Sequence, residues 1–576
     1  MKINTNPYAL NTMRRMSANT GALQQSLQRL SSGLRINGAK DDAAGLAISD
    51  RMTTQLRGNA QAMRNIKDGT SLLQTAEGAL STANDSLQRV RELAIQAANA
   101  TNSASDRRAL QAEVNQLLSE VDRIGTTTSF NGRQIFSQIE TSIGGDANQR
   151  AVMDGLKLGW LENAETRIRE FYGISGDGAE IDISVRNFTD GAGNIAAYVQ
   201  GSVGGDGKWS NLKLEVDMAD FTPPNLPNGG TEPMYNDRII LHEMVHAVMG
   251  RAIAQGTINN WFIEGAAEFI HGADERLATD IANAGGGDAG IAAIVNNIAD
   301  GSGTPTWVLD SAHYSSGYAA TRYLHDKLKG AGATDGIKDF FVYLSENDNV
   351  AGMNHALDHF FGTGAGNAAY TEADFLVEFR NEGLDFIKNE MDLTNADTGA
   401  VGGLDADGGT SYTAESIITM QGTRVGEDAL TGFKANFEKI GLGVSGYENL
   451  EFQVGYAALQ TINTQVGAMN TKALGLDDID IATLPSVAIL RVDEALDYVR
   501  TMRGEIGAQL SRFEAASRSL ESTNVDISAA RSRTMDADYA QETATLVRNQ
   551  ILQQAGTAML AQAKAVPQIA LQLLRG

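Results

Sequence analysis

Residues 73–97, LQTAEGALSTANDSLQRVRELAIQA, decide the fold of the two ends of this chain. Small and apolar side chains recur there at alternating intervals of three and four residues, at Leu73, Ala76, Leu80, Ala83, Leu87, Val90, Ala94 and Ala97. This period predicts a long helix with a narrow apolar seam that needs a partner helix. The same spacing recurs near the other end, at Val492, Leu496, Val499, Met502, Ile506, Leu510 and Phe513. We therefore expect the two ends of the chain to pair in a helical bundle.

The middle of the 576-residue chain differs in composition from both ends. All 7 histidines and all 4 tryptophans lie between residues 160 and 359, whereas the ends are rich in Ala, Gln, Ser, Leu and Arg. A chain of this length is expected to form about three to five domains. We expect terminal regions at 1–147 and 446–576 and an inserted domain at 148–445.

Local patterns predict that the inserted domain is α+β. Residues 149–173 have a helical pattern, and apolar residues alternate between glycines in 180–216, which predicts a sheet. The proline-rich segment 222–227 is expected to be a stiff loop. A stretch rich in Gly, Asp and Thr, from about residue 389 to 412, is expected to be a linker or surface loop.

The segment His242-Glu243-Met244-Val245-His246 is the minimal motif of a zinc peptidase. Apolar residues on both sides predict a buried helix. Residues four apart lie on the same helical face about one turn apart, so both imidazoles can reach one metal ion. Glu243 lies about 100° round the helix from His242, where it would face the attacking water rather than the metal. The alternative is a pair of core histidines.

Residues 261–269, WFIEGAAEF, are predicted to form a second helix that carries the third ligand. A catalytic zinc site needs three protein ligands and an open position, and two histidines with one glutamate are an established set. Glu264 is our candidate for that glutamate. Glu268, one turn further on, is placed to accept the free ring N–H of His242 or His246 and so fix its tautomer. The alternative for both glutamates is a solvated helix face.

Two other ligand sets are disfavoured. The metzincin pattern requires a third histidine six residues after His246, where this chain has Ala252, and a glycine where it has Met249. His271 lies seven residues after Glu264, and on one continuous helix the two would be separated by about 10 Å of rise. We therefore expect His271 not to share a metal with Glu264.

The segment EGAAEF, residues 264–269, together with the upstream HEMVH motif, resembles the gluzincins and, within them, the bacterial collagenase-like peptidases. The resemblance implies a zincin-like fold and a zinc endopeptidase. It also implies that His242, His246 and Glu264 are the zinc ligands and that Glu243 is the general base. Whether calcium (Ca2+) is required as well as zinc (Zn2+) is left open by the sequence.

Gluzincins also supply a Tyr or His that donates to the oxyanion from further along the chain. By this resemblance, the segment SAHYSSGY, residues 311–318, is the expected source, with Tyr314 as the first candidate and His313 as the second. The spacing of Tyr314 and Tyr318 is also typical of aromatic residues that pack in a helical core.

Short segments at both ends resemble bacterial flagellin. They are MKINTN (1–6), LQRLSSGLRIN (27–37), KDDAAGLAI (40–48) and FNGR (130–133) near the N-terminus, and FEA (513–515), DADYA (536–540) and LQLLRG (571–576) near the C-terminus. The resemblance implies an extracellular subunit that self-assembles into the helical flagellar filament of a motile bacterium. Its expected partners are the flagellar export machinery and the filament cap. The segment QRVREL (88–93) resembles one that innate immune receptors bind and that also forms subunit contacts.

The whole chain thus resembles the flagellinolysins, which are flagellins with a metallopeptidase inserted in the exposed region. Protein or peptide substrates are expected. The alternative is a purely structural flagellin whose insert is an inactive adhesive or antigenic domain. A net charge of −25 disfavours nucleic acid and anionic membranes as partners. We expect no membrane span, because no run of 18 apolar residues occurs, and no disulfide, because the chain has no cysteine.

Overall fold

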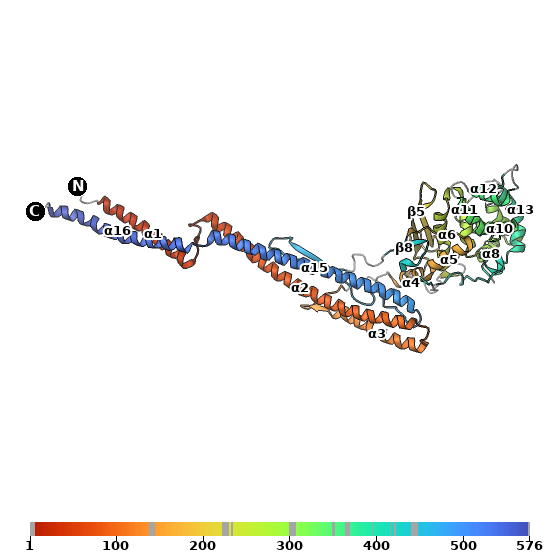
Figure 1. Ribbon diagram of the computed structural model, residues 1–576, viewed down its shortest axis with the longest axis horizontal. Helices are drawn as coiled ribbons and strands as arrows, with labels where there is room; N and C mark the ends of the chain where they lie inside the picture. Colours follow the sequence, from red (N-terminus) through yellow and green to blue (C-terminus); the bar gives the residue numbers. More distant parts are fainter. Residues whose placement is uncertain are drawn as a thin grey trace.

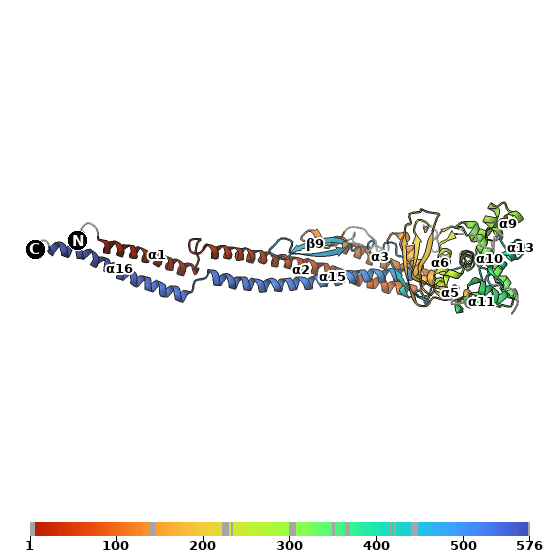
Figure 2. The same cartoon turned by 90° about the horizontal axis from the view of Figure 1, so that it is seen from above.

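A long helical rod and an α+β unit make up the molecule (Figure 1). The computed structural model describes residues 6–137, 145–221, 230–231, 234–298, 307–347, 352–362, 369–394, 397–414, 416–419, 422–424, 426–438 and 447–573. Both termini lie at one end of the rod, and the α+β unit lies at the other end in both views (Figures 1 and 2).

Two antiparallel helix pairs build the rod. Helix α1 (Pro7–Ser32) lies beside α16 (Tyr539–Leu573), and α2 (Ala43–Ala98) lies beside α15 (Pro485–Met535) (Figures 1 and 2). Helix α3 (Ala104–Thr127) packs on α2. The seam between α2 and α15 consists of the residues with heptad spacing: all eight of those from Leu73 to Ala97 are fully buried. The pairing of the two ends therefore follows the predicted seams.

The two helix pairs are interrupted at the same level of the rod. Helix α1 ends at Gly33, whose left-handed backbone (φ 70°) allows the chain to leave the helix. The Gly33 carbonyl accepts a hydrogen bond from the backbone N–H of Ala537 (2.9 Å), and Leu34 forms a β-bridge with Asp536. At this interruption, the N-terminal and C-terminal segments of the chain therefore contact each other through backbone hydrogen bonds.

Short strands lie along the side of the rod (Figure 2). β1 (Ser129–Phe130) pairs with β2 (Arg133–Gln134), and β9 (Tyr447–Gln453) forms an antiparallel hairpin with β10 (Thr461–Gly467). Their apolar residues join the same core as α2 and α15, so they belong to the rod.

A four-stranded sheet forms one layer of the α+β unit. Its strand order is β4-β5-β3-β8, with bounds Ala197–Val203, Trp209–Asp217, Ala179–Arg186 and Phe433–Phe437. β3 runs parallel to both β5 and β8, whereas β4 is antiparallel to β5 and forms one edge. β6 (Gly230–Thr231) and β7 (Met234–Tyr235) form a separate pair. β8 is the last strand of the sheet in sequence. Its pairing with β3 brings the chain from the end of the unit back beside the unit's first strand.

Helices pack on the sheet and on each other to complete the unit. They are α4 (Ala147–Gly155), a π-helical turn (Leu156–Trp160), α5 (Leu161–Tyr172), α6 (Asn236–Ala252), α7 (Asn260–Phe269), α8 (Asp274–Asn283), α9 (Gly287–Ile298), α10 (Ser311–Gly330), α11 (Ile337–Glu346), α12 (Met353–Phe361), α13 (Glu372–Glu390) and α14 (Leu404–Asp407). One hydrophobic core joins residues from Val152 to Ala435 and is separate from the core of the rod. Within the described residues, no helix is long and apolar enough to span a membrane.

The stretch 389–412 is more than a linker, and the prediction for it was wrong in this respect. Ala400 and Val401 are buried in the core of the unit, and the backbone N–H of Val401 donates to the carbonyl of Phe269 (3.0 Å). Glycines in this stretch allow the backbone to lie directly against helices. The same glycine-rich composition is also typical of a surface loop, so composition alone predicted a loop. The proline-rich segment 222–227 lies outside the described residues.

Ion pairs fix the start of the α+β unit to the rod. The buried Asp154 of α4 pairs with the buried Arg491 of α15, with 2.7 Å between carboxylate oxygen and guanidinium nitrogen. Lys157 also pairs with Glu494, again between the unit and α15. Because both contacts join the first helices of the unit to the rod, the unit is held at the rod end by more than its two connecting segments.

Candidate metal centre

Helix α6 places the HEMVH motif in the centre of the unit. Seven apolar residues of α6 are fully buried: Ile240, Leu241, Met244, Val245, Ala247, Val248 and Met249. His242, Glu243 and His246 share the helix with them, and His242 and Glu243 line a cavity that is described below. The helix is therefore apolar nearly all round, as expected for a helix inside a core.

Helix α7 carries Glu264 and packs against both α6 and α10. Its approach to α10 is very close. A Cβ atom on Gly265 would lie 2.2 Å from the carbonyl oxygen of Gly317 and 2.4 Å from the hydroxyl of Thr321. A Cβ atom on Gly317 would lie 2.7 Å from the carbonyl oxygen of Trp261. Glycine at both positions thus sets the separation of the two helices, and with it the position of Glu264.

Replacing Gly265 by alanine is expected to push α7 away from α10. We expect a destabilisation of about 1–3 kcal/mol from overpacking and a weaker zinc affinity, because Glu264 moves with its helix. Thermal unfolding and chelator competition measure the two effects. Gly330 of α10 is the matched control, because no atom of the residues that the structure describes lies within 4 Å of a Cβ added there. Zinc affinity equal to the parent in Gly265→Ala would show that this contact does not position Glu264.

Three side chains bring their donor atoms together in a triangle. The Nε2 atoms of His242 and His246 are 3.2 Å apart, and each lies 3.3 Å from Oε2 of Glu264. Donors at 2.0–2.1 Å from a tetrahedral zinc ion are separated by about 3.3–3.4 Å. The spacing and the donor types therefore fit zinc with a fourth position open.

The charges of the cluster also suit a cation. Burial alone would lower the pKa of His242, but hydrogen bonds to Glu264 and Glu268 raise it to about 10. Burial alone would raise the pKa of Glu264, but His246 and His242 hold it well below its usual range. The carboxylates of Glu264 and Glu268 thus stabilise a positive charge at His242. A metal ion that displaces the proton from His242 would be stabilised by the same carboxylates.

Glu268 orients one of the two histidines. Its Oε1 lies 3.1 Å from Nδ1 of His242, on the side of the ring opposite to the Nε2 donor. The same oxygen accepts a hydrogen bond from Nη1 of Arg276 (2.8 Å). A carboxylate on Nδ1 fixes the tautomer that leaves Nε2 free to bind a metal. Of the two histidines considered for Glu268, the structure thus brings His242 to it.

Glu243 points towards the edge of the sheet. Its Oε2 accepts a hydrogen bond from the backbone N–H of Val199 in β4 (2.8 Å), and only 8 % of the residue is exposed. Burial raises the pKa of the Glu243 carboxyl. A raised pKa suits a group that accepts a proton and later returns it. Because this N–H points away from β5, the free edge of β4 faces the site.

A cavity of about 570 Å³ lies beside these residues. It is lined by the start of β4 and the segment before it, by α6, by the end of α7, the turn after it and the start of α8, and by the start of α10. His242, Glu243, Glu268 and Tyr314 all face it. The cavity therefore gives a ligand access to Glu243 and to the His242 side of the cluster.

The two candidate oxyanion donors lie in different surroundings. The Tyr314 ring lines the cavity, 6.1 Å from the His242 ring, and burial raises the pKa of its phenol, which keeps it a proton donor. The His313 ring is bound by Asp310 (2.7 Å) and is not among the lining residues. The arrangement favours Tyr314. Tyr318 instead packs in the core, as its helical spacing suggested.

The argument that set His271 apart on a continuous helix was wrong, because α7 ends at Phe269 and His271 lies in the turn that follows. Its ring centre is 6.1 Å from that of His242, and its Nε2 is 3.9 Å from Oε2 of Glu268. His271 thus lies on the Nδ1 side of His242, away from Glu264. Arg276 and the Val199 N–H were missed entirely, because neither is marked by a local pattern.

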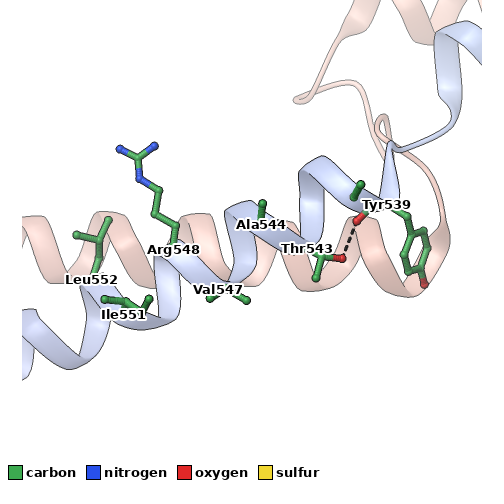
Figure 3. A pocket seen from close by; sticks show the side chains of 8 residues that line it. Tyr539, Thr543, Ala544, Val547, Arg548, Ile551 and Leu552 are labelled. Carbon is green, nitrogen blue, oxygen red and sulfur yellow. Dashed lines mark hydrogen bonds between the residues drawn. The ribbon is translucent and has the colours of Figure 1, made fainter.

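Another hollow lies on the rod, along α16 (Figure 3). Eight residues line it, among them Tyr539, Thr543 and the apolar Val547, Ile551 and Leu552. Arg548 is the charged residue among these eight. Its lining residues include no histidine or carboxylate. It therefore has the character of a helix-packing surface rather than of a metal site.

Asp274, at the start of α8, is a buried acid outside the metal cluster. It accepts a hydrogen bond from the Tyr318 hydroxyl (2.8 Å), and its other oxygen has no hydrogen-bond partner among the described residues. Burial raises its pKa to about 8, with Asp405 and Glu275 adding to the rise and Tyr318 and Arg322 opposing it. The folded chain therefore holds a proton at Asp274 that the unfolded chain releases near pH 4.

Asp274→Asn is expected to make the unit less sensitive to pH. A carboxyl with a raised pKa stabilises the fold below about pH 4, and this contribution is lost as the pH rises towards 8. The amide does not titrate, so the variant should gain roughly 2–5 kcal/mol relative to the parent between pH 4 and 8. Thermal unfolding at several pH values checks this. Asp288→Asn, at an exposed ion pair, is the control, and parallel pH profiles for all three chains would contradict the prediction.

Known proteins match this chain at its ends and along its length. Residues 3–141 match the bacterial flagellin N-terminal helical region, and residues 489–574 match the bacterial flagellin C-terminal helical region. A flagellin of Salmonella typhimurium is 31% identical over 582 residues, which cover 100% of this chain and 99% of that protein. The B-type flagellin of Pseudomonas aeruginosa is 31% identical over 581 residues and covers 100% of both chains.

Proposed function

Because the chain belongs to the family of bacterial flagellins, it is a structural subunit of the extracellular flagellar filament, and we propose that its α+β unit is a zinc endopeptidase carried on that filament. The proposed domain is zincin-like and of the collagenase-like gluzincin type. Its substrates are extracellular proteins or peptides. The alternative is that the unit is an inactive adhesive or antigenic surface.

The observation that carries the proposal is the triangle of donor atoms. His242, His246 and Glu264 come from two helices, and their donor atoms lie 3.2–3.3 Å apart, close to the separation of about 3.3–3.4 Å around a tetrahedral zinc ion. When bound there, zinc would supply a Lewis acid that lowers the pKa of water towards about 7 and polarises the peptide carbonyl. These three residues would hold it.

The surrounding residues provide the remaining chemistry. Glu243 lies on the same cavity and would accept the proton of the attacking water, then deliver it to the leaving amine. Tyr314 would donate its phenol proton in a hydrogen bond to the developing oxyanion, a contribution of up to about 3–4 kcal/mol. Glu268 would keep His242 oriented.

The outer edge of β4, with which no described strand pairs, provides a place for an extended substrate. β4 is an edge strand of the sheet, and its Val199 N–H points at Glu243 rather than at β5. An extended peptide can add to such an edge through backbone hydrogen bonds, largely independent of its side chains. Substrate bound there would lie beside Glu243 and the cavity, which supports an endopeptidase rather than an enzyme for free amino acids.

Purified filaments test the proposal. Filaments incubated with a peptide library should cleave peptides internally, lose this activity in a zinc chelator, and regain it when zinc is restored. Mass spectrometry of the products locates the cut bonds. If zinc-saturated filaments cleave nothing in the library, the unit is an inactive surface domain and the proposal fails.

A further inference from the structure

The turn between α7 and α8 brings the start of α8, which carries Arg276, to the candidate site. Gly272, in this turn, has a left-handed backbone (φ 76°), and a Cβ atom there would lie 2.0 Å from the carbonyl oxygen of Thr398. Its own carbonyl accepts a hydrogen bond from the buried Arg238 of α6. The turn is thus held between α6 and the stretch at Thr398, and the third residue of α8, Arg276, faces α7.

Arg276 contacts two residues of the site at once. Its Nη1 donates to Oε1 of Glu268 (2.8 Å), the oxygen that also lies 3.1 Å from Nδ1 of His242. Its guanidinium carbon lies 5.4 Å from the centre of the Tyr314 ring. The Glu268 side chain is only 3% exposed and that of Arg276 is 19% exposed, so both contacts are largely shielded from water.

We propose that Arg276 is a positioning residue of the peptidase site, which holds Glu268 against His242 and holds the Tyr314 ring beside the cavity. The inference rests on the proposed function, because it assigns Arg276 a part in preparing the zinc ligand and the oxyanion donor. Arg276 acts through Glu268 and Tyr314 and touches neither metal nor substrate.

Arginine suits both contacts better than lysine. The planar guanidinium can donate to a carboxylate while its face lies against an aromatic ring, whereas an ammonium offers a point charge without a stacking face. Without the cation, Glu268 would be a buried carboxylate whose remaining ion-pair partners in the described part of the chain are His242 and the more distant His271. It would then bind its histidine less firmly, and Tyr314 would lose one of the groups that fix its ring.

Two substitutions in the full-length chain separate the two contacts. Arg276→Met removes the charge and the guanidinium donors but keeps an apolar side chain of similar length. Arg276→Lys keeps the positive charge without the planar guanidinium. The matched control is Arg251→Met, because Arg251 is also 19% exposed and also pairs with a carboxylate, that of Asp177. Zinc affinity by chelator competition, kcat and KM on one cleaved peptide, and thermal unfolding are measured for each.

For Arg276→Met we expect zinc affinity and kcat each to fall by about 10–100-fold relative to Arg251→Met, as when the partner of a ligand is lost. For Arg276→Lys we expect zinc affinity within about threefold of the parent, because Glu268 keeps a cation, but a kcat lowered with KM unchanged. Equal zinc affinity in Arg276→Met and Arg251→Met overturns the role on Glu268. A parental kcat in Arg276→Lys overturns the role on Tyr314.

The zinc measurement keeps this inference separate from the proposed function. If the parent binds zinc but cleaves no peptide, the endopeptidase assignment fails, and the zinc affinities of the variants still decide whether Arg276 positions Glu268. If Arg276→Met does not fold, Arg276→Lys still tests the proposal. A parental kcat in that variant overturns the role on Tyr314, and a tenfold loss of its zinc affinity contradicts the account in which a cation alone holds Glu268.

Discussion

Replacing His246 by alanine is expected to remove zinc from the filament and to abolish peptide hydrolysis with it. The parent should hold one zinc per chain through His242, His246 and Glu264. Loss of one of three protein ligands leaves a site with two, which no longer meets the requirement of a catalytic zinc centre. Elemental analysis of purified filaments gives the zinc content, and hydrolysis of a library peptide gives the activity.

Two histidine controls accompany this variant. His355→Ala, at an exposed position of α12, should keep zinc and activity. His271→Ala tests the neighbouring cluster of His242, Glu268 and His271, whose donor atoms also lie close together. It should keep zinc, because His271 lies on the Nδ1 side of His242. A full zinc content in His246→Ala would refute the ligand assignment, and zinc loss in His271→Ala alone would transfer the site to the other cluster.

Replacing Glu243 by glutamine is expected to lower turnover by roughly 10² or more while zinc stays bound and filaments still form. The amide keeps the size of the side chain but cannot accept the proton, and a general base contributes about 10²–10⁴-fold. The rate on a peptide, measured at full zinc content, shows the effect.

Glu264→Gln separates the two glutamate roles. A neutral amide is a poorer zinc ligand than a carboxylate, so this variant should bind zinc more weakly, which Glu243→Gln should not do. If Glu243→Gln filaments cleaved peptides at the parental rate, Glu243 would not be the base. Filament formation in both variants is the common control, since the rod has its own core.

The parts of the structure that follow local patterns could be predicted from the sequence. The seam of the rod follows from heptad spacing, because residues such as Leu80 and Leu87 recur at fixed intervals whatever lies around them. The approach of His242 to His246 follows from helical geometry alone. Glu264 was selected by its position in a second helix and by resemblance, and the structure brings it to both histidines.

Features that depend on packing between distant segments could not be predicted. β8 lies parallel to β3 although the two are separated by most of the unit, and no local signal gives that pairing. Arg276 reaches Glu268 only because α7 ends before His271 and Gly272 turns the chain. The close contact of Gly265 with Gly317 likewise requires knowledge of how α7 crosses α10. In each case the decisive contact is tertiary, and the residue involved has an ordinary local sequence.

X-ray absorption at the zinc edge of purified, zinc-equilibrated filaments tests the central claim most directly. The predicted result is one zinc per chain with four light-atom ligands at about 2.0–2.1 Å and the scattering pattern of two imidazole rings. The ring signal should fall by half or disappear with the metal in His246→Ala. Filaments that take up no stoichiometric zinc, or zinc surrounded by six oxygen atoms without an imidazole signal, would contradict the account.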